Sequence, residues 1–223
     1  MHNPVAERDD LAFDFGATAL GRSFHYDWTN YAVSPLDHIA QRYGEKGDPT
    51  PILLLVEDLL RLRDSDLSGG EINLLWCATD IALGAPVTAG KERDWLQEVV
   101  SFVVPLAKSR GASTAACSTY PECVPDGTSP AAVEHRRLTA EVVELVGLLN
   151  QRSGHEVPLA SMQEALRRCA ESVCTELAFR FLLCAANHFY AQLSPATYGR
   201  LERLGTAIGY GPHVVDGVRY LAN

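Results

Sequence analysis

The residues best equipped for chemistry lie near the N-terminus, in the run Phe24-His25-Tyr26-Asp27-Trp28. A histidine and a carboxylate two positions apart can form an acid–base pair or supply two ligands to a metal ion. Asp37 and His38 lie further along and could join them. A metal site would require more ligands at helical spacing, and the chain contains neither His-x-x-x-His nor Glu-x-x-His. We therefore interpret the rings of Phe24 and Trp28 as a structural anchor and expect no bound metal or cofactor.

A second candidate lies in an apolar segment, where Cys184 and His188 are spaced to share one face of a helix. Such a pair can form a reactive thiolate, although a buried structural histidine is the favoured interpretation. The chain has no Gly-x-Ser-x-Gly elbow, no phosphate-binding Walker loop and no Gly-x-Gly-x-x-Gly turn. We expect no catalytic residues. The alternative that remains open is a small helical enzyme using His25, Asp27 and His38, or Cys184 and His188.

The six cysteines include no Cys-x-x-Cys pair, and we expect them to be reduced, structural thiols. Cys117 and Cys123 lie in a Gly-, Ser- and Pro-rich stretch, where oxidation would close a small ring. The other four lie in segments expected to be helical, where cysteine packs as a small apolar group: Cys77, Cys169, Cys174 and Cys184.

The charge distribution is more informative than any single residue. The chain carries a net charge of −9, and residues 1–113 hold 17 acidic against 10 basic side chains. This balance makes the chain a poor candidate for binding nucleic acids or anionic membranes. An acidic surface would attract a basic protein partner and accelerate its capture, and it would also supply solubility. The residues we expect at a partner contact are Asp58, Asp64, Asp66 and Glu71.

Helical signals recur along the chain, and no segment alternates with period two. Ser-Pro and Thr-Pro pairs and Ser-x-x-Glu capping boxes mark the expected helix starts. Pro105 should kink or split the helix that contains it. The sequence predicts an all-α fold, either a multi-helix bundle or a short helical-repeat array, without a substantial sheet. About nine helices are expected, at residues 34–44, 50–63, 68–83, 91–109, 129–153, 161–170, 175–191, 194–208 and 213–221.

The domain organisation follows from the one long stretch without helical signals. We expect an acidic helical half at 1–110 with an aromatic N-terminal segment, a loop at 111–128, and a second helical half at 129–223 packed on the first. No apolar stretch reaches the roughly 18 residues that span a bilayer, and the N-terminus lacks the pattern of a secretory signal. These features predict a cytoplasmic protein.

One set of motifs resembles a known family. Phe24-His25-Tyr26-Asp27-Trp28 is similar to the Phe-His-x-Asp-Trp signature of small helical immunity proteins of bacterial contact-dependent growth inhibition systems. The order that follows is also similar: Asp58-Leu59-Leu60, then Ser65-Asp66-Leu67-Ser68, Leu75-Trp76 and Arg93-Asp94-Trp95-Leu96. The resemblance covers residues 20 to about 100.

The resemblance implies a protein that is not an enzyme but binds and neutralises a cognate toxin domain, many of which have basic clefts. The leading hypothesis is therefore a toxin-neutralising protein whose acidic helices contact a basic toxin surface. Trp28, Trp76 and Trp95 are expected to be structural. A helical adaptor within a larger complex is a third possibility.

Overall fold

The computed structural model describes residues 13–25, 27–44, 47–79, 89–112, 135–151, 157–211 and 213–222. Across these ranges the chain forms ten α-helices, and its one β-pairing is a bridge between Leu193 and Ala222. The prediction of an all-α, multi-helix fold without a sheet is confirmed. The α-helices are α1 (Gly16–Ser23), α2 (Pro35–Tyr43), α3 (Thr50–Arg63), α4 (Gly69–Cys77), α5 (Glu92–Ser109), α8 (Thr139–Gly147), α9 (Leu159–Arg168), α10 (Thr175–His188), α11 (Pro195–Ile208) and α12 (His213–Asp216).

Local capping chemistry starts three of these helices as predicted. The Ser34 hydroxyl accepts from the Asp37 backbone N–H before α2, and Ser194 does the same for Thr197 before α11. Ser68 and Glu71 form a reciprocal capping box at the start of α4. Short-range side-chain to backbone hydrogen bonds can be inferred from sequence alone because both partners lie within one helical turn.

Three local expectations are corrected. Thr50 is the first residue of α3 rather than its cap: the N-cap position is Pro49, and the Thr50 backbone N–H and hydroxyl donate to the preceding Asp48 at 2.9 and 2.8 Å. Ser161 lies inside α9, which begins after the extended Pro158 without a side-chain cap. Pro105 does not split its helix, because α5 continues from Glu92 to Ser109. Pro105 is exposed, so water can solvate the carbonyl that its missing N–H leaves unpaired.

Helix α1 lies before residue 34, where the first predicted helix begins. Phe15 at its N-cap position provides no side-chain cap. The cap comes instead from α3, where the Asp58 carboxylate accepts the Ala17 backbone N–H at 2.8 Å. A cap supplied from another helix leaves no local pattern, so reading the sequence in windows could not have found it.

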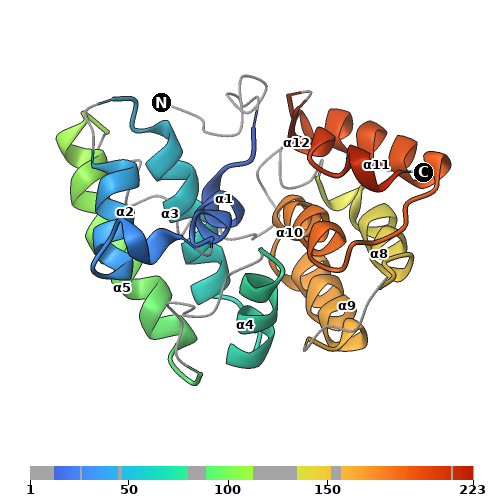
Figure 1. The fold of residues 1–223 in the computed structure, drawn as a ribbon, viewed down its shortest axis with the longest axis horizontal. Coiled ribbons are helices and arrows are strands. Elements are labelled where there is room, and N and C mark those ends of the chain that lie inside the picture. Colours follow the sequence, from blue (N-terminus) through green and yellow to red (C-terminus); the bar gives the residue numbers. More distant parts are fainter. Residues whose placement is uncertain are drawn as a thin grey trace.

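The helices form two sets that pack side by side (Figure 1). The first set, called here the first half, comprises α1–α5, with α3 packed between α1 and α5. The second half comprises α8–α12, the π-helical turn Cys169–Val173, called η4, and the short 3-10 helix Arg219–Leu221, called η5. Helix α10 packs against α1, and α9 packs against α4, so contacts join the halves along two helix pairs. One continuous hydrophobic core contains buried residues of both halves.

Several predicted features lie outside the described residues. These are most of the 111–128 loop with Cys117 and Cys123, and the helix start at Ser129-Pro130. In the preceding stretch, α4 ends at Cys77, before the end expected near residue 83.

Candidate functional site

A buried charge network connects the two halves of the molecule. Arg180 of α10 is only 1% exposed, and its Nη2 donates to Asp58 Oδ1 of α3 at 2.7 Å. Its Nε donates to Glu176 Oε1 at 2.9 Å, and its Nη1 donates to the Phe15 carbonyl at 2.8 Å. Burial alone would lower the pKa of Arg180, but the two carboxylates raise it well above its usual value. The guanidinium therefore stays charged and holds α1, α3 and α10 together.

Arg61 extends this network toward η4. It forms an ion pair with Glu57 one turn earlier in α3, and its Nη1 lies 3.6 Å from Glu176 Oε2. The same nitrogen contacts Cys174 Sγ at 3.4 Å. Tyr210 donates its hydroxyl to Glu176 Oε1 at 2.5 Å from the segment after α11. The charges are thus paired within the protein interior, as buried ions require.

Asp58 has an internal role, contrary to its expected place at a partner contact. Its side chain is inaccessible to solvent, with 0% exposure, and its two oxygens accept from Arg180 and from the backbone N–H of Ala17. The physical reason is that α3 is buried on nearly all sides over residues 52–60. The sequence pattern of α3 shows acidic residues at this position but not that α1 and α10 cover them.

The other three predicted contact residues lie close together in the chain, Asp64 and Asp66 between α3 and α4 and Glu71 in the first turn of α4. We call residues 62–71 the acidic turn. Asp64 is about one-third exposed (34%) and pairs with Arg63, whereas Asp66 is 67% exposed. The Ser172 hydroxyl donates to Asp66 at 2.9 Å.

Glu71 is the least exposed of these acidic residues, and its carboxylate is held from two sides. Arg168 donates to both Glu71 oxygens at 2.8 Å. Burial would raise the pKa of Glu71, but hydrogen bonds from Ser68 and Arg168 bring it below its usual value. Asp64, Asp66 and Glu71 therefore share a single segment, with an arginine beside each.

Arg93 of α5 fixes the backbone of the acidic turn. Its guanidinium donates to four carbonyl groups of that segment, including Ser65 O at 3.0 Å and Leu62 O at 3.3 Å. The other two acceptors are the carbonyls of Arg63 and Leu67. A charged guanidinium group that is hydrogen-bonded to four backbone oxygens restricts the conformations of the turn. The exposed carboxylates are therefore presented on a preorganised backbone.

The aromatic motif residues form part of the core. The ring of Phe24 lies edge-on to Trp28, with centroids 5.3 Å apart, and contacts Trp95 at 6.5 Å. Phe24, Trp28, Trp76 and Trp95 are all buried. His25 and Asp27 of the same motif are exposed, and the Asp27 backbone N–H donates to His25 Nδ1 at 3.3 Å.

The residues of the enzyme alternative fall into two separate environments. His38 Nε2 lies 3.0 Å from Ser23 Oγ, and the Ser23 hydroxyl donates to the Leu20 carbonyl at 2.6 Å. The serine proton is therefore directed away from His38, so the pair is not arranged as a nucleophile and its base. Cys184 is only 2% exposed, and burial raises the pKa of its thiol to about 12. A buried neutral thiol is a poor nucleophile, which favours the structural interpretation of Cys184 and His188.

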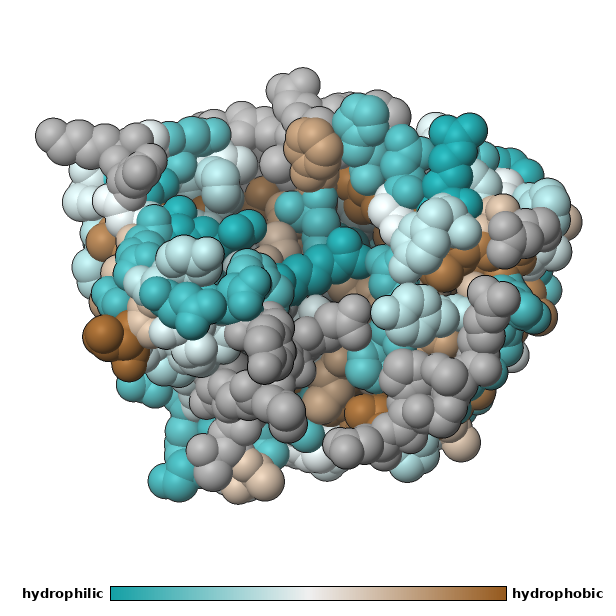
Figure 2. Space-filling view, viewed as in Figure 1, coloured by the Kyte–Doolittle hydropathy of each residue, from teal (hydrophilic) through white to brown (hydrophobic). Residues whose placement is uncertain are grey.

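A polar cleft lies between α1, α2 and α12, with a volume of ≈ 670 Å³. A smaller pocket of ≈ 330 Å³ adjoins it and shares Arg22 and His25 as lining residues. In the space-filling view, hydrophilic side chains border a hollow near the middle of the face where the two halves meet (Figure 2). His25 and His38 both line the larger cleft, whereas Cys184 lines the smaller pocket.

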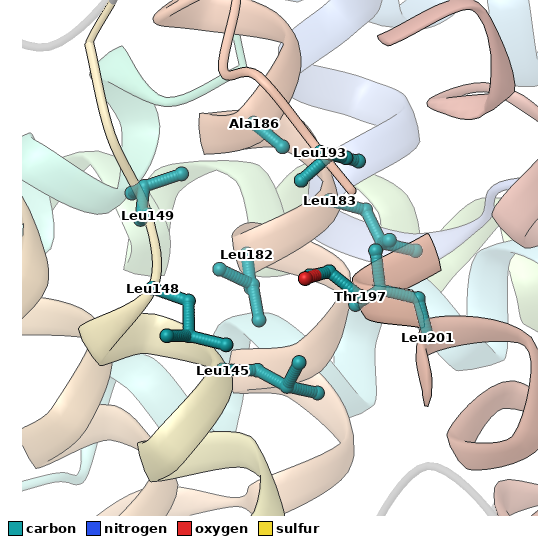
Figure 3. Close-up of a pocket in the computed structure, with 9 residues that line it drawn as sticks. All are labelled: Leu145, Leu148, Leu149, Leu182, Leu183, Ala186, Leu193, Thr197 and Leu201. Carbon is teal, nitrogen blue, oxygen red and sulfur yellow. The ribbon is translucent and has the colours of Figure 1, made fainter. Parts of the chain in front are cut away.

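A third pocket lies in the second half, between α8, α10 and α11. Its volume is ≈ 10 Å³, about the space of one water molecule. Leucine side chains surround it, and Thr197 supplies the one polar side chain (Figure 3). This pocket is a small packing gap between apolar helices rather than a ligand site. Its lining residues are Leu145, Leu148, Leu149, Leu182, Leu183, Ala186, Leu193, Thr197 and Leu201.

Two arginines that organise the structure were not singled out from the sequence. A signal for Arg180 was present, because an arginine between apolar residues of a buried helix requires a carboxylate partner. Arg93 belongs to the Arg-Asp-Trp-Leu motif, but nothing in that motif indicates that its partners are backbone carbonyls. Backbone acceptors are independent of residue type and leave no sequence signature.

Comparison with known proteins adds no assignment: no protein-family model, no curated protein and no solved structure matches the chain. Among the described helices, none combines the length and apolar character needed to cross a membrane. The described part of the chain also contains no group of three or more His, Cys, Asp or Glu side chains arranged to hold a metal ion.

Proposed function

We propose that the protein is a non-enzymatic binding protein that neutralises a cognate toxin domain through its acidic turn. The observation that carries this proposal is the preorganised backbone of residues 62–71, held by Arg93 and by the capping box of Ser68 and Glu71. A rigid binding segment loses little conformational entropy when a partner docks. Two exposed carboxylates on such a segment suit a basic protein surface.

The motif residues on which the resemblance to immunity proteins rests contact one another. Arg93 of the Arg-Asp-Trp-Leu motif holds the turn that contains the Ser-Asp-Leu-Ser motif, and Trp95 contacts Phe24 of the Phe-His-x-Asp-Trp motif. Motifs that are far apart in the chain therefore stabilise one structural unit. The proposed binding role rests on the resemblance and on the acidic turn.

The proposed contact surface contains fewer exposed carboxylates than the number of acidic residues in the first half suggests. Asp66 is the most exposed carboxylate of the acidic turn, and Asp64 lies two residues before it. Arg168 lies 3.5 Å from Asp66, so a cation of the partner would share this carboxylate with an internal arginine. We therefore expect the carboxylates to contribute more to the association rate than to the lifetime of the complex.

The test begins with the purified partner domain, identified by cross-linking and affinity capture from the source organism. Association rates are then measured by surface plasmon resonance at two salt concentrations, using the double variant Asp64→Lys, Asp66→Lys. We expect roughly 10-fold slower association and a weaker salt dependence, because long-range charge attraction governs encounter. Growth rescue of cells that express the partner tests neutralisation directly.

The matched control is the double variant Glu144→Lys, Glu202→Lys, which makes the same change of charge in the second half. It should keep most of the wild-type association rate. Equal losses for both double variants would assign the effect to net charge and overturn the acidic turn as the contact. Failure of the wild-type protein to rescue growth would overturn the neutralising function itself.

A further inference from the structure

The polar cleft between α1, α2 and α12 has a lining suited to an anionic ligand. Arg22 and Arg42 line it together with three histidines, against two carboxylates, Asp14 and Asp216. Guanidinium groups bind phosphate through paired hydrogen bonds. The cleft volume of ≈ 670 Å³ falls within the roughly 300–1,000 Å³ typical of small-molecule sites. The histidines are His25, His38 and His213.

Both cleft carboxylates have contacts within the protein. Asp14 accepts from the Thr18 hydroxyl at 2.6 Å and lies 3.6 Å from Arg22 Nε. Asp216 accepts from the Tyr198 hydroxyl at 3.2 Å and pairs with His213 Nδ1 at the same distance. These contacts reduce the repulsion that each carboxylate would exert on a bound anion.

The geometry of His25 directs one further donor toward the cleft. His25 Nδ1 accepts from a backbone N–H, so the proton of its neutral ring is on Nε2. His213 Nδ1 faces the Asp216 carboxylate and donates to it, so Nε2 of that ring is an acceptor, and His213 contributes its ring surface to the cleft rather than a donor.

An aromatic surface accompanies these polar groups. Phe13 is 69% exposed and stacks on His213, with ring centroids 5.3 Å apart and an interplanar angle of 18°. Both residues line the cleft, and the exposed Tyr220 lines the adjoining pocket. Exposed aromatic rings beside arginines can stack a planar ring while the cations hold a phosphate.

We infer that this cleft binds a small phosphorylated ligand with a planar ring, of the nucleoside monophosphate class. Arg22 and Arg42 hold the phosphate, and the stacked pair of Phe13 and His213 receives the ring. The cleft and the acidic turn share no residue, so this inference stands independently of the toxin-binding proposal.

Isothermal titration calorimetry of the full-length protein with AMP, adenosine, ribose 5-phosphate and inorganic phosphate tests the inference. AMP should bind most tightly, and loss of either the phosphate or the base should weaken binding roughly 10-fold or more. No binding of AMP at millimolar concentration would overturn the inference. Equal affinities for AMP and adenosine would overturn the role of the arginines.

Two variants locate the site. Arg42 is exposed, so Arg42→Gln should leave the fold intact and weaken AMP binding roughly 10-fold. The control Arg167→Gln changes an exposed arginine of α9 outside the cleft and should bind AMP like the wild type. Phe13→Ala should weaken AMP but not ribose 5-phosphate, because it removes only the stacking surface. Equal AMP affinity for Arg42→Gln and Arg167→Gln would exclude the cleft.

Discussion

Asp58 and Asp66 are the same residue type, close together in the chain, and their environments are opposite. Asp58 lies in the middle of α3, is closed off from solvent and is hydrogen-bonded to Arg180 and to the start of α1. Asp66 lies in the acidic turn after α3, and most of its carboxylate is exposed. The first joins the two halves of the molecule, and the second is available to a partner. Formal charge therefore does not distinguish an internal connection from an external contact.

The same distinction changes the interpretation of the acidic first half. Glu57, Asp58 and Glu92 are all buried, so part of the negative charge counted in residues 1–113 does not reach the surface. The buried carboxylates position helices, and the exposed ones set the electrostatic field that a partner meets. A buried ion pair contributes little net stability, but the loss of one partner is costly because the other charge remains buried.

The largest expected effect on stability comes from removing one partner of the buried ion pair. Asp58→Ala leaves Arg180 without its closest carboxylate in the interior, and we expect a loss of about 3–5 kcal/mol in the free energy of unfolding. Asp66→Ala removes an exposed carboxylate and should cost about 1 kcal/mol or less. Urea denaturation, monitored by circular dichroism, measures both. Similar losses for the two variants would contradict the contrast between these residues.

Gly16 gives a second test of how closely Asp58 is packed. Its φ is +62°, and a Cβ at this position would lie 1.9 Å from Asp58 Oδ2. Gly90 has φ +81° with no atom within 4 Å of such a Cβ, so it isolates the backbone effect. Gly90→Ala should cost about 1–2 kcal/mol from the left-handed conformation alone. Gly16→Ala should cost more, because the new methyl group also displaces the carboxylate.

Thermal and urea unfolding of Gly16→Ala and Gly90→Ala, measured side by side, give the difference directly. If the two variants lose equal stability, Asp58 can move away from α1 without cost. In that case the capping of α1 by Asp58 contributes little to the fold.

Arg93 tests the rigidity of the acidic turn. Arg93→Gln removes the charged donor shared by four carbonyls, and we expect a loss of about 1.5–3 kcal/mol, the range for hydrogen bonds to charged groups. Amide exchange in residues 62–71 should accelerate in the same variant. Arg63→Gln is the matched control, because its more exposed guanidinium pairs with Asp64 and should contribute at most about 1 kcal/mol. Unchanged exchange in Arg93→Gln would show that the turn is rigid without this residue.

The sequence supported the helical class and the helix starts whose partners lie within one turn, as at Ser34, Ser68 and Ser194. Side-chain periodicity also gave the bounds of α2, α3 and α11 to within a residue or two. These features depend on near neighbours, so a local pattern records them.

Features that depend on distant residues were not predictable in this way. Helix α1 has its cap in α3, and Asp58 pairs with Arg180 across a sequence separation of 122 residues. The cleft likewise combines His25 and His38 with His213, which no local window contains. His25 and His38 were singled out from the sequence as polar residues of interest, but their common environment arises only from the packing of α1, α2 and α12.

His38 is partly buried, between the buried environment of Asp58 and the exposed environment of Asp66. It gives the smallest expected effect on stability. Burial lowers its pKa from 6.5, and the hydrogen bond that His38 donates to Ser23 opposes the shift. As the pH falls through 6.5, the unfolded chain therefore binds a proton at this position before the folded protein does. The contribution of His38 to stability is fully present above pH 6.5 and is lost as the pH falls toward the lower, folded-state pKa.

The variant His38→Gln keeps an amide N–H that can donate to Ser23 but cannot titrate. The urea midpoint of the wild type should be lower near pH 5.5 than near pH 7.5, and this drop should be smaller for His38→Gln. The difference between the two drops isolates His38, because every other titrating group is common to both proteins. Identical drops would mean that His38 is solvated as well in the folded protein as in the unfolded chain. His38 would then belong with the exposed polar groups, and the buried region would begin at the rings of Phe24 and Trp28.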